Sequence, residues 1–189
     1  AAAAKPALTV TLTTPQTAEW AQALAATGNI AAWQEAVISA EISNFRLTEV
    51  TADVGDRVRK CQLLARIASG TVAAELAQSQ AAVAEAQATL AEARANAQRA
   101  RDLQSTGAMS EQQIRQYLTA ERAAQARLDV AHARVQGDRV RLAQTRVLAP
   151  DDGIISARTA TVGSLAQSGQ ELFRMIRGSR LEWRAEVPE

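Results

Sequence analysis

The chain of 189 residues has few of the residues that build catalytic sites and large cores. Aromatic residues make up 3% of it, and the hydrophobic fraction of 47% is inflated by alanine, which buries little surface. A single cysteine, Cys61, excludes an internal disulfide framework. No apolar run reaches the length of about 18 residues that a membrane span needs, so none is predicted.

The charges are nearly balanced, and the formal net charge of +1 gives no indication of a nucleic-acid or anionic membrane partner. Metal sites need clustered ligands, but His132 is the only histidine and is expected to face solvent on a helix. Asp151 and Asp152 precede Gly153 and are interpreted as turn residues rather than as a catalytic pair. No nucleophile–histidine pattern and no glycine-rich phosphate loop is present, so the sequence predicts no enzymatic activity, no cofactor and no metal.

What the chain does have is a heptad pattern from Val72 to Thr145. Apolar or small residues recur there at the spacing of a narrow helical seam of the coiled-coil kind. The first arm carries them at Val72, Leu76, Ser79, Val83, Ala86, Leu90, Ala93 and Ala97, and the second at Ile114, Leu128, Val135 and Leu142, interrupted by Glu121. Each arm has roughly 34 residues, which predicts a hairpin about 50 Å long.

A short break at residues 105–110 separates the two arms. Gly107 suits the left-handed residue that ends a helix. Ser110 followed by Gln113 is the pattern of a capping box, and Glu111 is favourably placed against the helix dipole. A loop this short makes the two helices antiparallel neighbours.

The segments on either side of the hairpin resemble each other. Short β-prone stretches separated by turns occupy residues 37–67 and 147–176. Val54-Gly55, five residues and Cys61-Gln62 align with Val162-Gly163, five residues and Gly169-Gln170; with one residue of slippage, Asn44-Phe45 aligns with Gly153-Ile154. This self-similarity predicts two equivalent β-halves that pack on each other, with the hairpin inserted between them.

Two aligned turn positions differ between the halves. Asn44 stands opposite Gly153, and asparagine tolerates a positive φ best after glycine, so this turn is expected to survive. Cys61 stands opposite Gly169, and cysteine has no such tolerance. Either the turn does not need a positive φ, or Cys61 has been introduced in place of another residue.

The two ends of the chain are predicted to form further strands. Candidates near the start are residues 8–12, 20–24 and 30–33, the last two flanking a turn signal at Gly28-Asn29, although residues 18–26 could also be helical. Near the end, residues 181–187 alternate apolar and polar like a half-buried strand. We expect this strand to join residues 8–35 in a further β-domain, and the chain to be a fragment or partly ordered.

Together these features resemble the periplasmic adaptor proteins, also called membrane fusion proteins (HlyD-like), of Gram-negative tripartite efflux pumps. The resemblance covers nearly all of residues 35–189 and is carried by residues 54–64, 149–155 and 187–189. The family's tip motif is arginine, three residues, leucine, six residues, and serine or threonine. Arg99, Leu103 and Ser110 match this motif.

The resemblance implies that Arg99, Leu103 and Ser110 dock the tip of the hairpin onto a TolC-like outer-membrane channel. The tip loop of Gly107, Ala108 and Met109 belongs to the same surface. From the residues alone a plainer interpretation stays open, in which Arg99 is a solvated charge, Leu103 packs against Ile114, and Ser110 is simply an N-cap. The two roles of these residues can coexist.

The implied fold class is α+β: a lipoyl-like β-sandwich (barrel-sandwich hybrid) interrupted by a long antiparallel coiled-coil α-hairpin, plus part of a β-barrel domain. The expected turns of the lipoyl-like unit are at Asn44, Gly55, Gly153, Gly163 and Gly169. The expected divisions are N-terminal strands of a β-barrel or membrane-proximal region (1–35), the first lipoyl-like half (36–71), the hairpin (72–145), the second lipoyl-like half (146–178), and the start of a truncated β-barrel domain (179–189).

The implied function is that of a non-enzymatic periplasmic adaptor that links an inner-membrane transporter to the channel for export of drugs or other small compounds. A resistance-nodulation-division (RND) transporter is the first expectation, and an ATP-driven (ABC) exporter remains open. Copies are expected to pack side by side, as a hexamer by resemblance, in the periplasm, anchored to the inner membrane by a segment not present in this chain. A structural coiled-coil scaffold is the alternative; a lipoate or biotin carrier ranks third, because the hairpin stands where a carrier presents its lysine.

Overall fold

A computed structural model describes residues 10–20, 27–105 and 107–186. They form a mixed structure of helices and strands, as expected from the sequence. The chain divides into two units, one from Ala31 to Glu182 and one from the residues before and after it. The larger unit contains two helices and a group of short strands, which we call the β-unit (residues 35–67 and 146–177).

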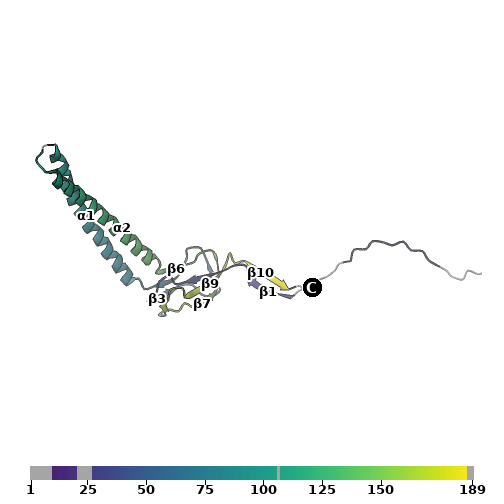
Figure 1. Ribbon diagram of the computed structural model, residues 1–189. Coiled ribbons are helices and arrows are strands. Elements are labelled where there is room, and N and C mark those ends of the chain that lie inside the picture. Colours follow the sequence, from purple (N-terminus) through teal and green to yellow (C-terminus); the bar gives the residue numbers. More distant parts are fainter. Residues whose placement is uncertain (1–9, 21–26, 106, 187–189) are drawn as a thin grey trace, which may run out of the picture. The chain divides into compact units, whose positions relative to one another are not determined.

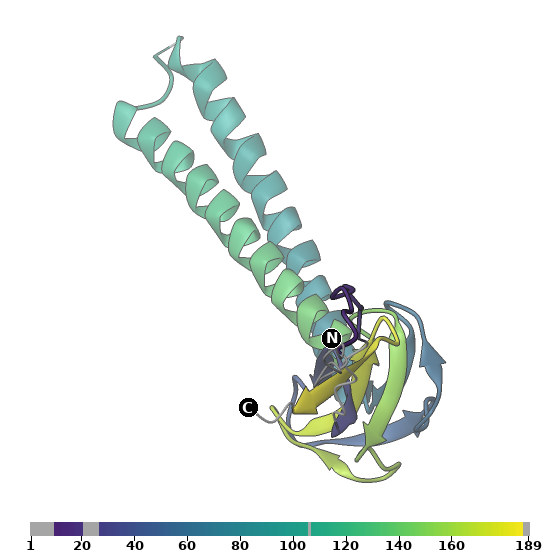
Figure 2. The ribbon, with the colours of Figure 1, turned by 90° about the vertical axis from the view of Figure 1, so that its right-hand side faces the viewer.

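The two helices, α1 (Gly70–Gln104) and α2 (Glu111–Ala143), lie side by side and are joined by the short loop that the sequence predicted (Figures 1 and 2). Every predicted seam residue is buried or half-buried, and Ala100 and Ala124, which are not among the predicted ones, are buried as well. The predicted residues that are buried are Val72, Ser79, Leu90 and Ala97 on α1, and Ile114, Leu128 and Val135 on α2. Neither helix within the described ranges is long and apolar enough to cross a membrane.

The β-unit consists of two four-stranded sheets. One has the order β2-β9-β7-β4 and the other β6-β5-β3-β8, so each sheet takes strands from both sides of the hairpin. The strands are β2 (Glu35–Ser39), β3 (Phe45–Val50), β4 (Arg57–Val58), β5 (Leu63–Ile67), β6 (Arg146–Leu148), β7 (Gly153–Arg158), β8 (Leu165–Ala166) and β9 (Glu171–Arg177). Side chains from both halves share one core, with Leu47 and Leu64 from the first and Ile155 and Phe173 from the second.

The internal repeat predicts the strands correctly but the upstream alignment was wrong by one residue. Strands β7, β8 and β9 begin at residues 153, 165 and 171, each 108 residues after the starts of β3, β4 and β5 at residues 45, 57 and 63. The repeat therefore needs no slippage, and Gly153 corresponds to Phe45 rather than to Asn44. Asn44 has a φ of 68°, whereas Gly153 is the first residue of a strand. Glycine is needed there because a Cβ would lie 2.2 Å from the carbonyl oxygen of Ile176.

The other turn positions do take the left-handed conformation. Gly55 and Gly163 have φ values of 91° and 89°, and Gly169 has 81°. Cys61 has a φ of 63°, so of the two alternatives for this position, the one in which the turn does without a positive φ is wrong. This cysteine occupies a backbone conformation that costs a non-glycine residue roughly 1–2 kcal/mol.

Strand β1 (Thr27–Ala32) pairs with β10 (Leu181–Glu186) in a two-stranded sheet, as the sequence predicted for residues 181–187. The predicted turn at Gly28-Asn29 is wrong, because both residues lie within β1. A Cβ on Gly28 would lie 2.4 Å from the carbonyl oxygen of Arg184, so this glycine permits close approach of the strands.

The expected strand at residues 8–12 is not formed by its described part, residues 10–12. Its first two residues, and residues 21–24 of the next candidate, lie outside the described ranges.

Candidate functional site

The candidate site is the tip of the hairpin, formed by the last turns of α1, the loop and the first turn of α2. Arg99 and Leu103 are four residues apart on α1, so they project from the same face of the helix. Both side chains are exposed, and Leu103 keeps 38% of its surface accessible. An exposed leucine beside an exposed guanidinium is the pairing that the tip motif predicted.

Arg99 is held by its own helix rather than by an acid. Its Nη2 donates a hydrogen bond to Oδ1 of Asn96, three residues earlier. No ion pair joins it to a carboxylate among the described residues. Since a guanidinium carries five donors in a planar fork, most of its hydrogen-bonding capacity points to solvent or to a partner.

Ser110 performs the capping role that the sequence predicted. Its Oγ accepts a hydrogen bond from the backbone N–H of Gln113 at 3.3 Å, and Oε1 of Gln113 accepts one from the backbone N–H of Ser110 at 3.3 Å. This reciprocal capping box satisfies donors at the first turn of α2. Ser110 therefore fixes the start of α2, whatever else it contacts.

The tip loop is organised around one left-handed glycine. Gly107 has a φ of 68°, as predicted, and its N–H donates to the carbonyl oxygen of Gln104 at 3.5 Å. Ala108 is exposed and Met109 is half-buried.

One feature near the tip was missed in the sequence. Arg101 forms an ion pair across the hairpin with Glu121, the residue that interrupts the heptad seam. Glu121 keeps only 21% of its side chain exposed, so the charge is neutralised at the edge of the interface between the helices. The interruption was the signal, because a carboxylate at a seam position needs a partner.

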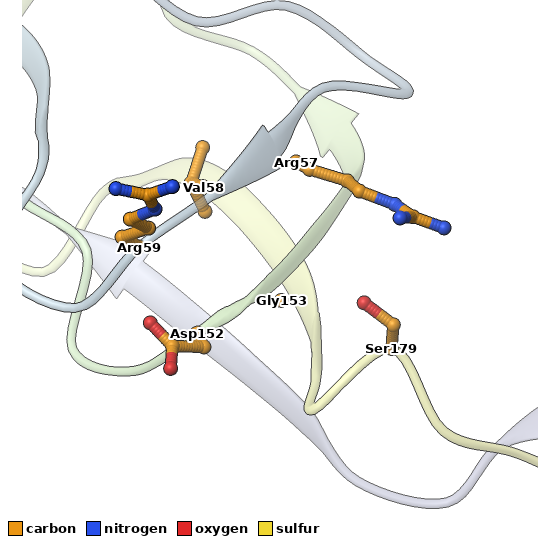
Figure 3. Close-up of a pocket in the computed structure, with 6 residues that line it drawn as sticks. All are labelled: Arg57, Val58, Arg59, Asp152, Gly153 and Ser179. Carbon is orange, nitrogen blue, oxygen red and sulfur yellow. The ribbon is translucent and has the colours of Figure 1, made fainter.

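The β-unit carries a pocket of about 520 Å³ beside β4 and the start of β7 (Figure 3). Its lining residues are Arg57, Val58, Arg59, Asp152, Gly153 and Ser179. The guanidinium groups of Arg57 and Arg59 point away from each other, so they do not converge on one ligand (Figure 3). Oδ1 of Asp152 accepts a hydrogen bond from the backbone N–H of Lys60 at 2.7 Å.

Asp151 and Asp152 are turn residues, as interpreted from the sequence. Oδ1 of Asp151 accepts from the backbone N–H of Asp152 at 2.9 Å, and its Oδ2 lies 2.7 Å from Nη2 of Arg177. The hydrogen bond from Arg177 lowers the pKa of Asp151 below its ordinary value, with a smaller effect from the Asp152 N–H. A carboxylate held in its charged form by arginine is a poor general acid.

Metal-binding geometry is not found in the part of the chain that the structure describes. No three His, Cys, Asp or Glu side chains gather there at ligand distance. His132 is exposed on α2, as predicted, and Cys61 is exposed on a turn of the β-unit. The hairpin tip is therefore the best candidate for a functional surface.

Comparison with known proteins finds similar solved structures. No family model matches the chain, and no curated protein matches it. The membrane fusion protein Spr0693 from Streptococcus pneumoniae R6 is similar with a TM-score of 0.65 and 19% identity, over 86% of this chain and 67% of that one. MacA from Actinobacillus actinomycetemcomitans has a TM-score of 0.56 and 24% identity, over 84% of this chain and 54% of its own.

A third similar structure is the periplasmic adaptor protein EmrA, with a TM-score of 0.50 and 12% identity, over 84% of this chain and 77% of that one. The chain spans about half the length of MacA, at 54%. These likenesses confirm, at the level of the fold, the resemblance to membrane fusion and periplasmic adaptor proteins.

Proposed function

We propose that this chain is the adaptor part of a tripartite efflux pump, which links an inner-membrane transporter to a TolC-like outer-membrane channel in the periplasm. The tip of the hairpin docks on the channel through Arg99, Leu103 and Ser110. The β-unit acts as a lipoyl-like sandwich that packs against copies of itself, and the chain catalyses no reaction. The transporter is of the RND type, and the cargo consists of drugs or other small compounds.

The observation that carries this proposal is the exposed pair of Arg99 and Leu103 at the far end of the hairpin. With 35 and 33 residues, the two helices extend about 50 Å from the strands that they join. Leu103 lies far from the β-unit and is not part of its core. Packing of that core therefore does not explain why an apolar residue stands at this position. A leucine and an arginine on one helical face can instead supply an apolar contact and a directed hydrogen-bond donor to a protein partner.

The second candidate function is a structural scaffold whose tip has no specificity for a channel. The capping box favours this candidate, because the helix cap accounts for Ser110 without any partner protein. The two candidates differ in what they require of Leu103. A scaffold tolerates a charge at this exposed position, whereas a docking surface does not.

The test is co-purification of the full-length protein with its cognate channel, comparing the wild type with the Leu103→Glu variant. Val140→Glu is the matched control, because Val140 is also an exposed apolar residue on the hairpin, with 57% of its surface accessible, but lies near the end of α2 remote from the tip. Circular dichroism at 222 nm verifies that both variants keep their helix content. Docking predicts that only Leu103→Glu loses the channel.

Retention of the channel by the Leu103→Glu variant would contradict docking through the tip and favour the scaffold. Equal loss in both variants would indicate a general effect of charge on the hairpin. The ATP-driven alternative for the transporter is tested separately, by which inner-membrane protein co-purifies with the wild-type adaptor.

A further inference from the structure

The two faces of the hairpin differ in how the helices are connected. On one face, Nη2 of Arg94 donates to Oε1 of Gln125 at 2.6 Å, and Arg101 pairs with Glu121. Each face carries a groove, and the one on the opposite face, of about 310 Å³, has a floor that includes Ala93, Ala120 and Ala124. We call the face that carries this second groove the open face. Among the described residues, no hydrogen bond or ion pair crosses this groove, and the ion pair between Glu75 and Arg141 joins the helices outside it, nearer the β-unit.

Three arginines of α2 are spaced seven residues apart along the open face: Arg127, Arg134 and Arg141. Heptad spacing keeps side chains in one row along a helix of a hairpin. Arg141 meets a carboxylate of α1, since its Nη1 lies 2.9 Å from Oε2 of Glu75. The residues seven and fourteen positions after Glu75, which continue its row toward the tip, are Ala82 and Thr89. Arg134 and Arg127 therefore lack the partner that Arg141 has.

A matching acidic row lies on α1. Glu85 and Glu92 are also seven residues apart, both are exposed, and Glu92 lines the same groove as Arg127. Neither carboxylate forms a hydrogen bond or ion pair with the described residues, and the guanidinium groups of Arg127 and Arg134 form none. Each row spans about 10.5 Å along its helix.

The two rows also stand at the same height on the hairpin. The contacts of Arg94 with Gln125 and of Glu75 with Arg141 give the register of the antiparallel helices. Interpolation between them places Glu92 level with Arg127, and Glu85 level with Arg134, to within about two residues. The acidic row and the basic row therefore match in spacing, in position along the hairpin and in opposite charge. Charges that only face solvent would not need to match in all three respects.

We infer that the open face is an interface with a second copy of this chain, in which Glu85 and Glu92 of one hairpin pair with Arg134 and Arg127 of the other. With the two hairpins pointing in the same direction, α1 of one copy lies antiparallel to α2 of the next, so both ion pairs form together. The alanine floor and the small residues between the charges let the helices approach closely. This inference rests on the self-association included in the proposed function, and adds the residues that specify it.

The experiment is charge reversal, with self-association measured by sedimentation equilibrium. The Arg127→Glu/Arg134→Glu variant and the Glu85→Arg/Glu92→Arg variant should each associate at least about tenfold more weakly than the wild type. Exposed ion pairs contribute roughly a factor of two to five each, and the reversal also places like charges opposite each other. The quadruple variant should regain the wild-type constant. An equimolar mixture of the two double variants should associate more tightly than either alone.

The matched control is Arg122→Glu/Arg139→Glu, which makes the same change of charge at two exposed arginines of α2 outside the row. It should leave association unchanged, and circular dichroism should show equal helix content in all variants. No rescue in the quadruple variant, an equal loss in the control, or a wild type that stays monomeric at every concentration would each overturn the inference.

This inference and channel docking can fail independently. The Leu103→Glu variant should self-associate like the wild type, and the quadruple variant should still co-purify with the channel. If Arg127→Glu/Arg134→Glu loses the channel while self-association is unchanged, the arginines meet another protein, and the interface between copies is wrong.

Discussion

The β-unit and the hairpin are stabilised in different ways. Of the eight largest fully buried side chains in the described ranges, seven belong to the β-unit, and Val72, near the start of α1, is the only one from the hairpin. The hairpin instead buries alanines, a serine and a few separated larger residues along a narrow seam. The β-unit therefore supplies most of the stability from burial, whereas the hairpin extends an exposed surface with little core of its own.

The largest expected effect is on the β-unit. Phe173 is fully buried among core residues of both halves, so Phe173→Ala should destabilise this unit by about 3–5 kcal/mol. Hydrogen exchange, detected by mass spectrometry at peptide resolution, measures the loss of protection separately in β7, β9 and the middle of the hairpin. Leu90→Ala is the counterpart in the hairpin, where Leu90 belongs to a much smaller buried cluster.

If the two regions are distinct in stability, Phe173→Ala lowers protection in the β-unit far more than at the middle of α1. Leu90→Ala should do the reverse and cost about 2 kcal/mol, at the low end of leucine truncations. Equal loss of protection everywhere after either substitution would contradict separate stabilities, because it would indicate one cooperative unit.

A glycine in each region should respond to alanine with opposite signs. At Gly153, a Cβ would lie 2.2 Å from the carbonyl oxygen of Ile176, so Gly153→Ala should cost about 1–3 kcal/mol as the strands shift. At Gly137 on α2, a Cβ meets only open space. Gly137→Ala should therefore stabilise the hairpin by about 0.5–1 kcal/mol, because alanine favours helix. Denaturant titrations measure whether each substitution lowers or raises the free energy of unfolding.

These glycines also show how far the sequence alone could go. The heptad period, Gly107 and the Ser110–Gln113 capping box depend on neighbours along the chain, so the helices and their loop were predicted with their ends nearly correct. Gly28 and Gly153 were read as turn residues, but both serve close approach to another strand. A glycine meets either need, and only the residues that lie near it in space distinguish them.

In the candidate site too, features that depend on neighbours along the chain were predicted, and those that depend on contacts between elements were not. Arg99, Leu103 and Ser110 lie where the motif predicted because their positions follow from the helix ends. The ion pair of Arg101 with Glu121 depends on the register between the two helices. A heptad pattern does not fix this register, because shifting one helix by seven residues brings equivalent seam positions together again. The docking role of the tip stays a prediction, since it depends on a partner.

A smaller effect compares the two halves of the β-unit. Cys61 and Gly169 occupy equivalent turns, with φ values of 63° and 81°. Cys61→Gly should stabilise the protein by about 1 kcal/mol by removing strain, and Gly169→Ala should destabilise it by a similar amount. Urea midpoints measure both. A destabilised Cys61→Gly variant would show that the thiol contributes contacts that outweigh its backbone strain.

The smallest expected effect concerns acid and again distinguishes the β-unit from the hairpin. Hydrogen bonds, above all from Arg177, hold the pKa of Asp151 below its ordinary value of 3.8, and a hydrogen bond from Arg174 lowers that of Glu171 below 4.5. A carboxyl whose pKa is lowered by folding stabilises the native state above its unfolded pKa. This contribution is lost as the pH falls through the lowered value. Both groups belong to the β-unit, so acid should weaken this unit through them.

The measurement is the free energy of unfolding of wild type and Asp151→Asn between pH 7 and about pH 2, a range that covers the ordinary carboxyl pKa. The variant should be slightly less stable at neutral pH, and the difference should disappear in acid, where Asp151 is protonated in both states of the wild type. Added salt should shrink the difference, because Asp151 and Arg177 are partly exposed and their attraction is screened. A difference that persists unchanged in acid would contradict an ionic origin for the effect of Asp151. The turn hydrogen bond from the Asp152 N–H would not explain such a difference, because asparagine can also accept it.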